Sequence, residues 1–256
     1  MFSMPGMSSC AMVMFAIFIM GGPLARPASA ANFNVNPTQV FLSAKATSAL
    51  LTVRNESDEP LRFQLSVFAW DQAATGELVL TPTDDIVFFP ALVTLAPKEE
   101  RRVRVGRVTG AGDREKTYRI FIEEMPPLVA VGTSGTAVRV LTKMGVPIFV
   151  RPARETATAV IGDVEQRAGT FHFALSNTGT VHFVPQQVTV RGLAGASTVF
   201  EQKLDGWYVL SGGKRDFELT VPKGDCTRVT SLVVEVTVNS SKLNQTLQTP
   251  AGACTL

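Results

Sequence analysis

The chain has 256 residues, of which 45% are hydrophobic and 18% charged, so it can bury a sizeable core and is not disordered throughout. Its formal net charge of +2 gives no electrostatic indication of a nucleic-acid-binding protein. The sequence has no glycine-rich phosphate loop and no cysteine–histidine spacing of a metal site. We therefore expect no cofactor, no metal ion, no nucleic acid and no small-molecule substrate.

The first thirty residues have the pattern of a secretory signal. Residues 11–20 form an apolar run, and Ala28, Ser29 and Ala30 form an A-x-A cleavage site. The run is short for a membrane span. We predict that residues 1–30 are a cleaved signal peptide and that the mature protein is exported.

Two cysteines remain after this cleavage. Cys10 leaves with the signal peptide, and Cys226 and Cys254 stay in the mature chain. An even number of cysteines in an exported protein favours a disulfide, which here would close a loop of roughly 30 residues and contribute about 3 kcal/mol. Two free thiols are the alternative.

Strand patterns fill the chain from Asn32 onward. Short segments alternate apolar and polar residues with the two-residue period of a half-buried strand, and turn-forming residues separate them. Such strands at spacings of roughly ten residues are typical of an all-β sandwich. The clearest strand segments are residues 33–35, 49–53, 63–67 and 103–105.

A second series of strands follows a polar stretch that begins at Pro152. Residues 171–179 repeat the pattern of residues 51–57, in which a strand runs into a turn led by asparagine. We therefore predict two sandwich domains, residues 31–153 and 154–256, joined by a short linker.

Residues 138–150 alternate for longer than most strands do, over roughly 43 Å. Val138, Val140 and Met144 share one parity with Val146, Ile148 and Val150, and Thr142 is the one polar member. One interpretation is a long interior strand. The other is an exposed edge strand that awaits a partner, because an apolar edge is otherwise an aggregation hazard and its retention indicates β-strand addition.

Seven short motifs follow one another along the chain. They are FAWDQ (68–72), LTPTDD (80–85), FFP (88–90), LAP (95–97), RRVR (101–104), TYRIFIEEMP (117–126) and FVRP (149–152). In this order they resemble the periplasmic PapD-like chaperones of the chaperone–usher pathway. The resemblance runs from about Phe33 to the C-terminus and is densest through Pro152. It is closer to the branch that serves Csu-type and spore-coat-U-like pili than to the P-pilus branch.

The resemblance implies two immunoglobulin-like β-sandwich domains, arranged in an L shape with a cleft between them. In that family the chaperone works in the periplasm, lends a strand to a pilus subunit that lacks one, and delivers the subunit to the outer-membrane usher. On this resemblance the lent strand is residues 138–150. Val138, Val140 and Met144 would enter the subunit, with Thr142 between them.

The family also implies a positive site for the subunit's C-terminal carboxylate. The two basic residues that form it elsewhere in the family are missing here, because residues 36–39 offer no arginine and the second position is Pro147. Arg119 is our favoured replacement, since a planar guanidinium can bind a carboxylate through paired hydrogen bonds. The further candidates are Arg101, Arg102 and Lys143, each of which is otherwise a solvated strand charge.

Glu124 and Arg151 match the residues that form an ion-pair network near the domain junction in the family, and Arg104 matches another basic position there. On this resemblance they fix the angle between the domains.

An enzyme is not expected. His172 and His182 are the only histidines, and both lie in alternating strand patterns, which favours a structural role. The alternative function is a secreted β-sandwich adhesin or a carbohydrate-binding module, although only two Trp and two Tyr are present.

Overall fold

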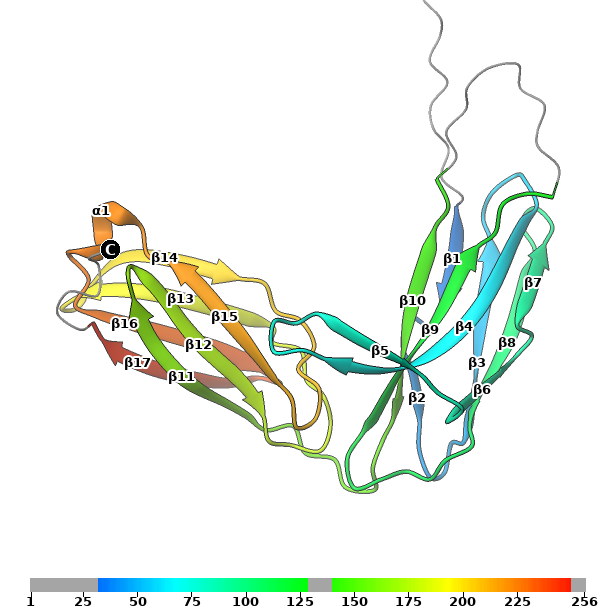
Figure 1. The fold of residues 1–256 in the computed structure, drawn as a ribbon, viewed down its shortest axis with the longest axis horizontal. Helices are drawn as coiled ribbons and strands as arrows, with labels where there is room; N and C mark the ends of the chain where they lie inside the picture. The colour runs from blue at the N-terminus through cyan, green and yellow to red at the C-terminus, as the bar shows by residue number, and fades with distance from the viewer. Residues whose placement is uncertain (1–31, 129–139, 250–256) are drawn as a thin grey trace, which may run out of the picture.

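The computed structural model describes residues 32–128 and 140–249. The predicted signal peptide and Cys254 lie outside these residues. The described chain consists of β-strands and one short helix, α1 (Lys223–Cys226). It forms two lobes, an N-terminal lobe of β1–β10 and a C-terminal lobe of β11–β17, which meet at an angle (Figure 1). None of the described helices is long and apolar enough to span a membrane.

Two sheets build the N-terminal lobe. One has the order β1-β3-β8-β6, and the other the order β2-β10-β9-β4-β5, with β7 paired to β4. Neighbouring strands are antiparallel except β2 and β10, which are parallel. The strands are β1 (Phe33–Asn36), β2 (Val40–Leu42), β3 (Ser48–Asn55), β4 (Leu61–Gln72), β5 (Leu78–Pro82), β6 (Ile86–Phe89), β7 (Leu92–Leu95), β8 (Glu100–Arg107), β9 (Lys116–Glu124) and β10 (Lys143–Val150).

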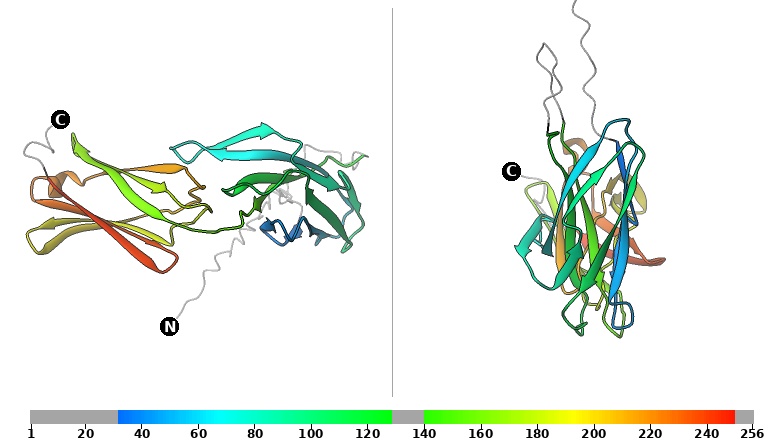
Figure 2. Two further views of the ribbon diagram at one scale, coloured as in Figure 1. Left: turned by 90° about the horizontal axis from the view of Figure 1, so that it is seen from below. Right: turned by 90° about the vertical axis from the view of Figure 1, so that its right-hand side faces the viewer.

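The C-terminal lobe also has two sheets, with the orders β11-β12-β15 and β14-β13-β16-β17. A linker at residues 151–158 leads into it from β10. In the left view of Figure 2 the lobes are separate bodies, and the β4–β5 hairpin reaches from the N-terminal lobe toward the C-terminal lobe. The strands are β11 (Ala159–Arg167), β12 (Thr170–Asn177), β13 (Gln187–Ala194), β14 (Ser197–Leu204), β15 (Lys214–Thr220), β16 (Ser231–Val238) and β17 (Ser241–Gln248).

Each lobe has its own apolar core between its sheets. Alternate residues point inward, as the two-residue strand period requires. Leu51, Phe63 and Ile120 are fully buried in the first core, and Phe171, Leu175 and Val190 in the second. The all-β prediction is therefore confirmed, and the two cores explain why the sequence shows two series of strands.

The asparagine-led turns make equivalent hydrogen bonds in both lobes. The Nδ2 of Asn55 donates to the carbonyl oxygens of Glu59 and Ala96, at 2.8 and 3.0 Å. The Nδ2 of Asn177 donates to those of Val181 and Val209, both at 2.9 Å. Each Oδ1 accepts the N–H two residues further on, an Asx turn. These buried amides hold each turn to a segment that is distant in the chain, in agreement with the repeat seen in the sequence.

Candidate functional site

Strand β10 has an open backbone edge along part of its length. It pairs with β9 from Lys143 to Val150, whereas β2 pairs with it only from Ile148 to Val150. On the side away from β9, residues 143–147 therefore have no strand neighbour among the described residues. The N–H of Glu124 donates to the carbonyl of Thr142 at 2.9 Å, so even-numbered residues of β10 bond to β9 and odd-numbered ones face the open edge.

The side chains of this strand change from exposed to buried along its length. Val146, Ile148 and Val150 lie in the N-terminal core, and Met144 packs partly against it. Val140, on the same parity, is 48% exposed. Regular strand structure begins at Lys143, five residues later than the sequence pattern predicts, and Val138 lies outside the described residues. Both sequence interpretations thus describe a part of this segment.

Arg119 lies at the centre of β9, beside the open edge. Its register partners are Pro147 on β10 and Phe68 on β4. A Cβ added to Gly145 would lie 3.6 Å from the Nη1 of Arg119 and 2.9 Å from the Cε1 of Phe121, so both side chains lie close against the backbone of β10 at this glycine. This arginine therefore lies on the strand next to the open edge, as the sequence predicted.

The guanidinium of Arg119 is buried against aromatic rings. The residue is only 9% exposed, and its Cζ lies 4.4 Å from the ring centroid of Trp70, a cation–π contact. Burial holds the pKa of Arg119 below its usual value, and an interaction with Tyr208 partly opposes this effect. The Nε of Arg119 and the Nε1 of Trp70 are both buried without a hydrogen-bond partner among the described residues. Two unsatisfied donors thus lie at one place.

The other predicted positive residues lie elsewhere or are already paired. Lys143 forms an ion pair with Glu123 at 2.9 Å and lies over the ring of Phe121. Arg101 pairs with Glu99 at 2.8 Å. Arg101 and Arg102 belong to β8, in the other sheet of the lobe, and both are exposed. Among the four candidates, only Arg119 is buried beside β10.

An aromatic cluster joins the two lobes. Trp70 and Phe149 of the N-terminal lobe pack with Tyr208 and Leu210 of the C-terminal lobe in a small buried cluster of their own. The ring centroids of Trp70 and Tyr208 are 5.3 Å apart. The Nε2 of Gln39 donates to the hydroxyl of Tyr208 at 2.6 Å. Arg119 therefore contacts the part of the molecule where the lobes meet.

A buried carboxylate also crosses the junction. Glu115 Oε2 accepts the N–H of His182 at 3.0 Å and lies 2.6 Å from its Nδ1. The imidazole of His182 stacks on Phe149 with a centroid distance of 3.8 Å. The side chain of Glu115 is completely buried. The sequence pattern indicated only a structural histidine, and its partner lies 67 positions away, so no local signal could have revealed this pair.

The ion-pair network of Arg104, Glu124 and Arg151 stays a prediction, and the structure places Glu124 and Arg151 at opposite ends of the β9–β10 pair. Glu124 lies opposite Thr142, whereas Val150, next to Arg151, lies opposite Lys116 at the other end of the antiparallel pair. About eight residues of strand, or roughly 26 Å, separate these ends.

The remaining two members of that network have other partners. Arg151 pairs with Glu155 at 3.4 Å and covers the ring of Phe41. Arg104, on β8, donates to the hydroxyl of Ser48 at 3.3 Å. Cys226 is buried in the second core, and its predicted disulfide with Cys254 stays a prediction. The described residues contain no group of three His, Cys, Asp or Glu that could hold a metal ion.

Comparison with known protein families decides between the two functions that the sequence left open. Residues 32–155 match the family described as "Pili and flagellar-assembly chaperone, PapD N-terminal domain". Residues 32–155 are therefore a PapD-like pilus-assembly chaperone domain. This family consists of chaperones and not of enzymes, so the prediction of a non-enzymatic protein is confirmed and the adhesin alternative loses its support. No curated protein sequence matches the chaperone.

Solved structures resemble the chaperone over both lobes. The Csu complex of Acinetobacter baumannii, CsuC with the tip subunit CsuE, matches with a TM-score of 0.58 and 15% identity, over 84% of this chain and 98% of the matched chain. The Salmonella enterica SafB chaperone with SafA pilin gives 0.57 and 17%, over 86% and 99%. The class 5 fimbriae chaperone CfaA gives 0.56 and 16%, over 86% and 100%. These similarities confirm the fold of two immunoglobulin-like domains.

Proposed function

We propose that this chaperone binds pilus subunits in the periplasm and completes their fold with the strand that contains the open edge of β10. The observation that carries the proposal is the edge at residues 143–147, which has no strand neighbour in the described structure and continues toward the exposed Val140. An unpaired edge of this kind is the template for β-strand addition.

Two kinds of group along this edge would contribute to subunit binding: the main chain would supply affinity, and the side chains would supply specificity. Odd-numbered peptide groups of β10 offer main-chain hydrogen bonds to any incoming strand. The even-numbered side chains Val138, Val140, Thr142 and Met144 would fill pockets of the subunit, and each buried apolar side chain would contribute about 1.5–3 kcal/mol. A pilus subunit that lacks a strand presents pockets of this kind, and two of the similar structures are complexes of a chaperone with a pilin or tip subunit.

Arg119 is the proposed anchor for the subunit's C-terminal carboxylate. Its guanidinium is buried, carries an unsatisfied Nε donor and lies beside Gly145 on the open edge. A carboxylate at this place would accept that hydrogen bond and neutralise a charge that burial disfavours. The neighbouring Nε1 of Trp70 is a second donor within the same cluster. Arg101, Arg102 and Lys143 fit this role less well, because they are exposed and two of them are already paired.

Several finer predictions belong to the same proposal. The pattern of residues 1–30 supports a cleaved signal peptide and periplasmic location, and the two cores support domains of residues 31–153 and 154–256. The sequence motifs support a relation to the Csu and spore-coat-U branch. Delivery to the outer-membrane usher would follow subunit binding.

The test is co-purification of the chaperone with pilins encoded by neighbouring genes, after co-expression in the periplasm. We expect a one-to-one complex with the wild-type protein. Val140→Asp should abolish it, because a carboxylate cannot enter an apolar pocket unpaired. The matched control is Val160→Asp, since Val160 is 46% exposed on β11 of the other lobe.

The anchor is tested in the same assay. Arg119→Ala should weaken the complex, and Arg119→Lys should restore less than the full affinity, because lysine lacks the planar fork of donors. Arg167→Ala, at an exposed position of β11, should have no effect. Undiminished binding by folded Val140→Asp would disprove strand donation. Undiminished binding by Arg119→Ala would disprove only the anchor.

A further inference from the structure

The sheet that contains β10 has a second free edge at its other end. The strand order β2-β10-β9-β4-β5 ends at β5, which pairs with β4 and with no other strand of the described chain. Three strand spacings, or roughly 14 Å, separate β5 from β10. In Figure 1, β5 belongs to the hairpin that projects from the N-terminal lobe toward the C-terminal lobe. The sheet can therefore accept a strand at this end as well as at β10.

Every residue of β5 is exposed, although the strand begins with three aliphatic residues. Leu78 is 42% exposed, Val79 46% and Leu80 37%. Sheet edges in proteins are usually protected by charged side chains or by bulges. Residues 78–81 carry no charge, and their pairing with β4 is continuous. An exposed apolar edge of this kind indicates a place for strand addition.

The hydrogen bonds of the hairpin determine which peptide groups of β5 face outward. The N–H of Ala73 donates to the carbonyl of Glu77 at 3.0 Å, and hydrogen-bonded pairs then alternate along the two strands. Odd-numbered residues of β5 therefore bond to β4, whereas the N–H and C=O groups of Leu78 and Leu80 point to the open edge. Pro82, the next residue on that side, has no N–H and ends the usable part of the edge.

The C-terminal lobe holds the tip of this hairpin in place. The N–H of Asp216 donates to the carbonyl of Ala74 at 2.8 Å, and a Cβ added to Gly76 would lie 3.4 Å from the Nε of Arg215. The edge is thus fixed at its tip by one lobe and along its length by β4. An edge that is already ordered lowers the entropy cost of adding a strand.

Three carboxylates surround the β5 edge. Glu77 precedes the strand, Asp84 follows it by two residues, and Asp71 lies on the adjacent β4. All three are exposed, and none forms an ion pair within the described ranges. Arg215, at the hairpin tip, has a charge interaction with Asp205. A complementary strand must therefore carry positive charge at its ends.

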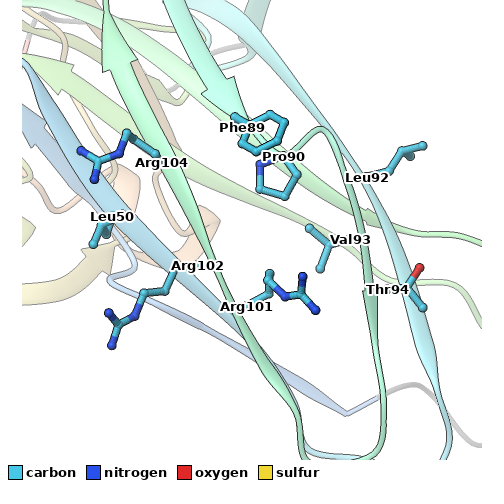
Figure 3. Close-up of a pocket in the computed structure, with 9 residues that line it drawn as sticks. All are labelled: Leu50, Phe89, Pro90, Leu92, Val93, Thr94, Arg101, Arg102 and Arg104. Atoms are coloured by element: carbon cyan, nitrogen blue, oxygen red, sulfur yellow. The ribbon is translucent and has the colours of Figure 1, made fainter.

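This negative charge distinguishes the β5 edge from other exposed parts of the lobe. Arg102 and Arg104 are exposed on β8, in the opposite sheet (Figure 3). Arg119 lies next to the open edge of β10. A strand with basic ends is repelled at both of those places, so its charge directs it to β5.

The same charges disfavour a second copy of this chain as the occupant. Antiparallel pairing of two β5 strands would bring Glu77 of one copy close to Asp84 of the other. Like charges in opposed positions destabilise a strand pair, and this contact would occur at both ends of the pair. The occupant is therefore a different segment with the opposite charge.

We propose that the edge of β5 is a second strand-addition site, which binds an extended segment of a partner protein with aliphatic residues at alternate positions and lysine or arginine at both ends. The main chain of Leu78 and Leu80 forms the hydrogen bonds, and their side chains contact the aliphatic residues. Glu77 and Asp84 bind the positively charged ends.

The experiment uses the full mature chaperone and a labelled peptide, Lys-Lys-Val-Thr-Val-Thr-Val-Lys-Lys. A control peptide has glutamate in place of every lysine. Two further peptides carry N-methyl groups either on the valines or on the threonines, which removes the N–H groups of one edge of the peptide strand. We expect saturable binding of the lysine peptide by fluorescence anisotropy, and loss of binding by only one of the two methylated peptides. Binding should weaken with added salt, because exposed charges are screened over about 10 Å at 0.1 M salt.

Variants of β5 locate the binding. Leu80→Pro removes an N–H from the open edge, a position at which an edge strand tolerates proline. Leu78→Ser with Leu80→Ser keeps the main chain and removes the aliphatic contacts. Each should reduce affinity at least about tenfold. Glu77→Lys with Asp84→Lys should exchange the preference, so that the glutamate peptide binds and the lysine peptide does not.

The matched control for the charge reversal is Asp58→Lys with Glu218→Lys, two exposed carboxylates away from β5, which should leave binding of the lysine peptide unchanged. Circular dichroism checks that each variant is folded. The assay contains no pilin, so its result is independent of strand donation from β10.

Four results would overturn the proposal. The first is equal binding of the glutamate peptide to the wild-type protein, which would show that charge is not recognised. The second is binding by both methylated peptides, which would exclude strand pairing. The third is undiminished binding by the folded β5 variants. The fourth is a chaperone dimer in sedimentation that Leu80→Pro dissociates, because a second copy would then cover the edge.

Discussion

The two halves of the 138–150 segment share one alternating pattern but have opposite environments. Toward the C-terminal end, Ile148 and Val150 lie in the core and β2 covers the backbone edge. Toward the N-terminal end, Val140 is exposed and the edge has no strand neighbour in the described residues. The difference shows that a two-residue period in the sequence identifies a strand and its apolar face. Whether that face is buried or exposed depends on the tertiary fold.

The largest expected effect comes from truncating the buried half. Ile148→Ala removes a fully buried side chain from the core, which should lower the free energy of unfolding by about 2–5 kcal/mol. Urea denaturation followed by circular dichroism measures this change. A loss below about 1 kcal/mol would mean that this half is not part of the core.

The next largest effect is expected at Gly145, where the exposed and buried halves of the 138–150 segment meet. A Cβ added to Gly145 would lie 2.9 Å from the Cε1 of Phe121 and 3.6 Å from the Nη1 of Arg119. Gly145→Val should therefore displace both side chains, destabilise the protein by about 1–3 kcal/mol and weaken pilin binding. Gly110→Val is the control, because its Cβ would meet nothing within 4 Å. Equal affinity for pilin in both variants would contradict this prediction.

A smaller effect concerns how stability depends on pH in the buried half of the 138–150 segment. Tyr118 lies opposite Ile148 and donates to the Oδ2 of Asp85 at 2.7 Å. Burial, helped by the hydrogen bond and the negative charge of Asp85, raises the pKa of Tyr118 above its usual value. Since the unfolded chain then loses this proton first, stability is retained below about pH 10 and decreases as the pH rises beyond it.

Tyr118→Phe should remove this alkaline dependence and cost about 1 kcal/mol at neutral pH. Urea midpoints at pH 8 and pH 11, compared between the two proteins, provide the measurement. A parallel decrease in both would assign the alkaline sensitivity to other groups.

The smallest effect belongs to the exposed half. Val140→Asp should change the free energy of unfolding by no more than about 0.5 kcal/mol, as surface substitutions generally do, although we expect it to abolish pilin binding. Thermal unfolding of the free variant measures this. A large destabilisation would show that Val140 packs against the protein itself.

The sequence allowed the fold class, the strand segments and the alternating side chains of β10 to be predicted, because all of these follow from local periodicity. It also favoured Arg119 as the anchor, and the structure places Arg119 on β9, which pairs with β10. The side-chain environment of Arg119 could not be predicted. Its burial depends on Trp70 from another strand and on Tyr208 from the other lobe.

The junction was the least predictable part, since its contacts are far apart in the chain. Glu124 was assigned to it by resemblance, but the antiparallel register places Glu124 at the distant end of β9. The carboxylate that does cross the junction is Glu115, which bonds to His182. Either residue alone gives no signal in the sequence, because a polar residue in a strand pattern is ordinarily exposed.

Pro147 determines how far an added strand can extend along β10. It faces the open edge, where it has no N–H to offer, and β2 occupies the same side from Ile148 onward. An incoming strand must therefore end near Gly145, beside Arg119. If clients add strands here, the strands of clients that differ in sequence would all share this one end of the paired region.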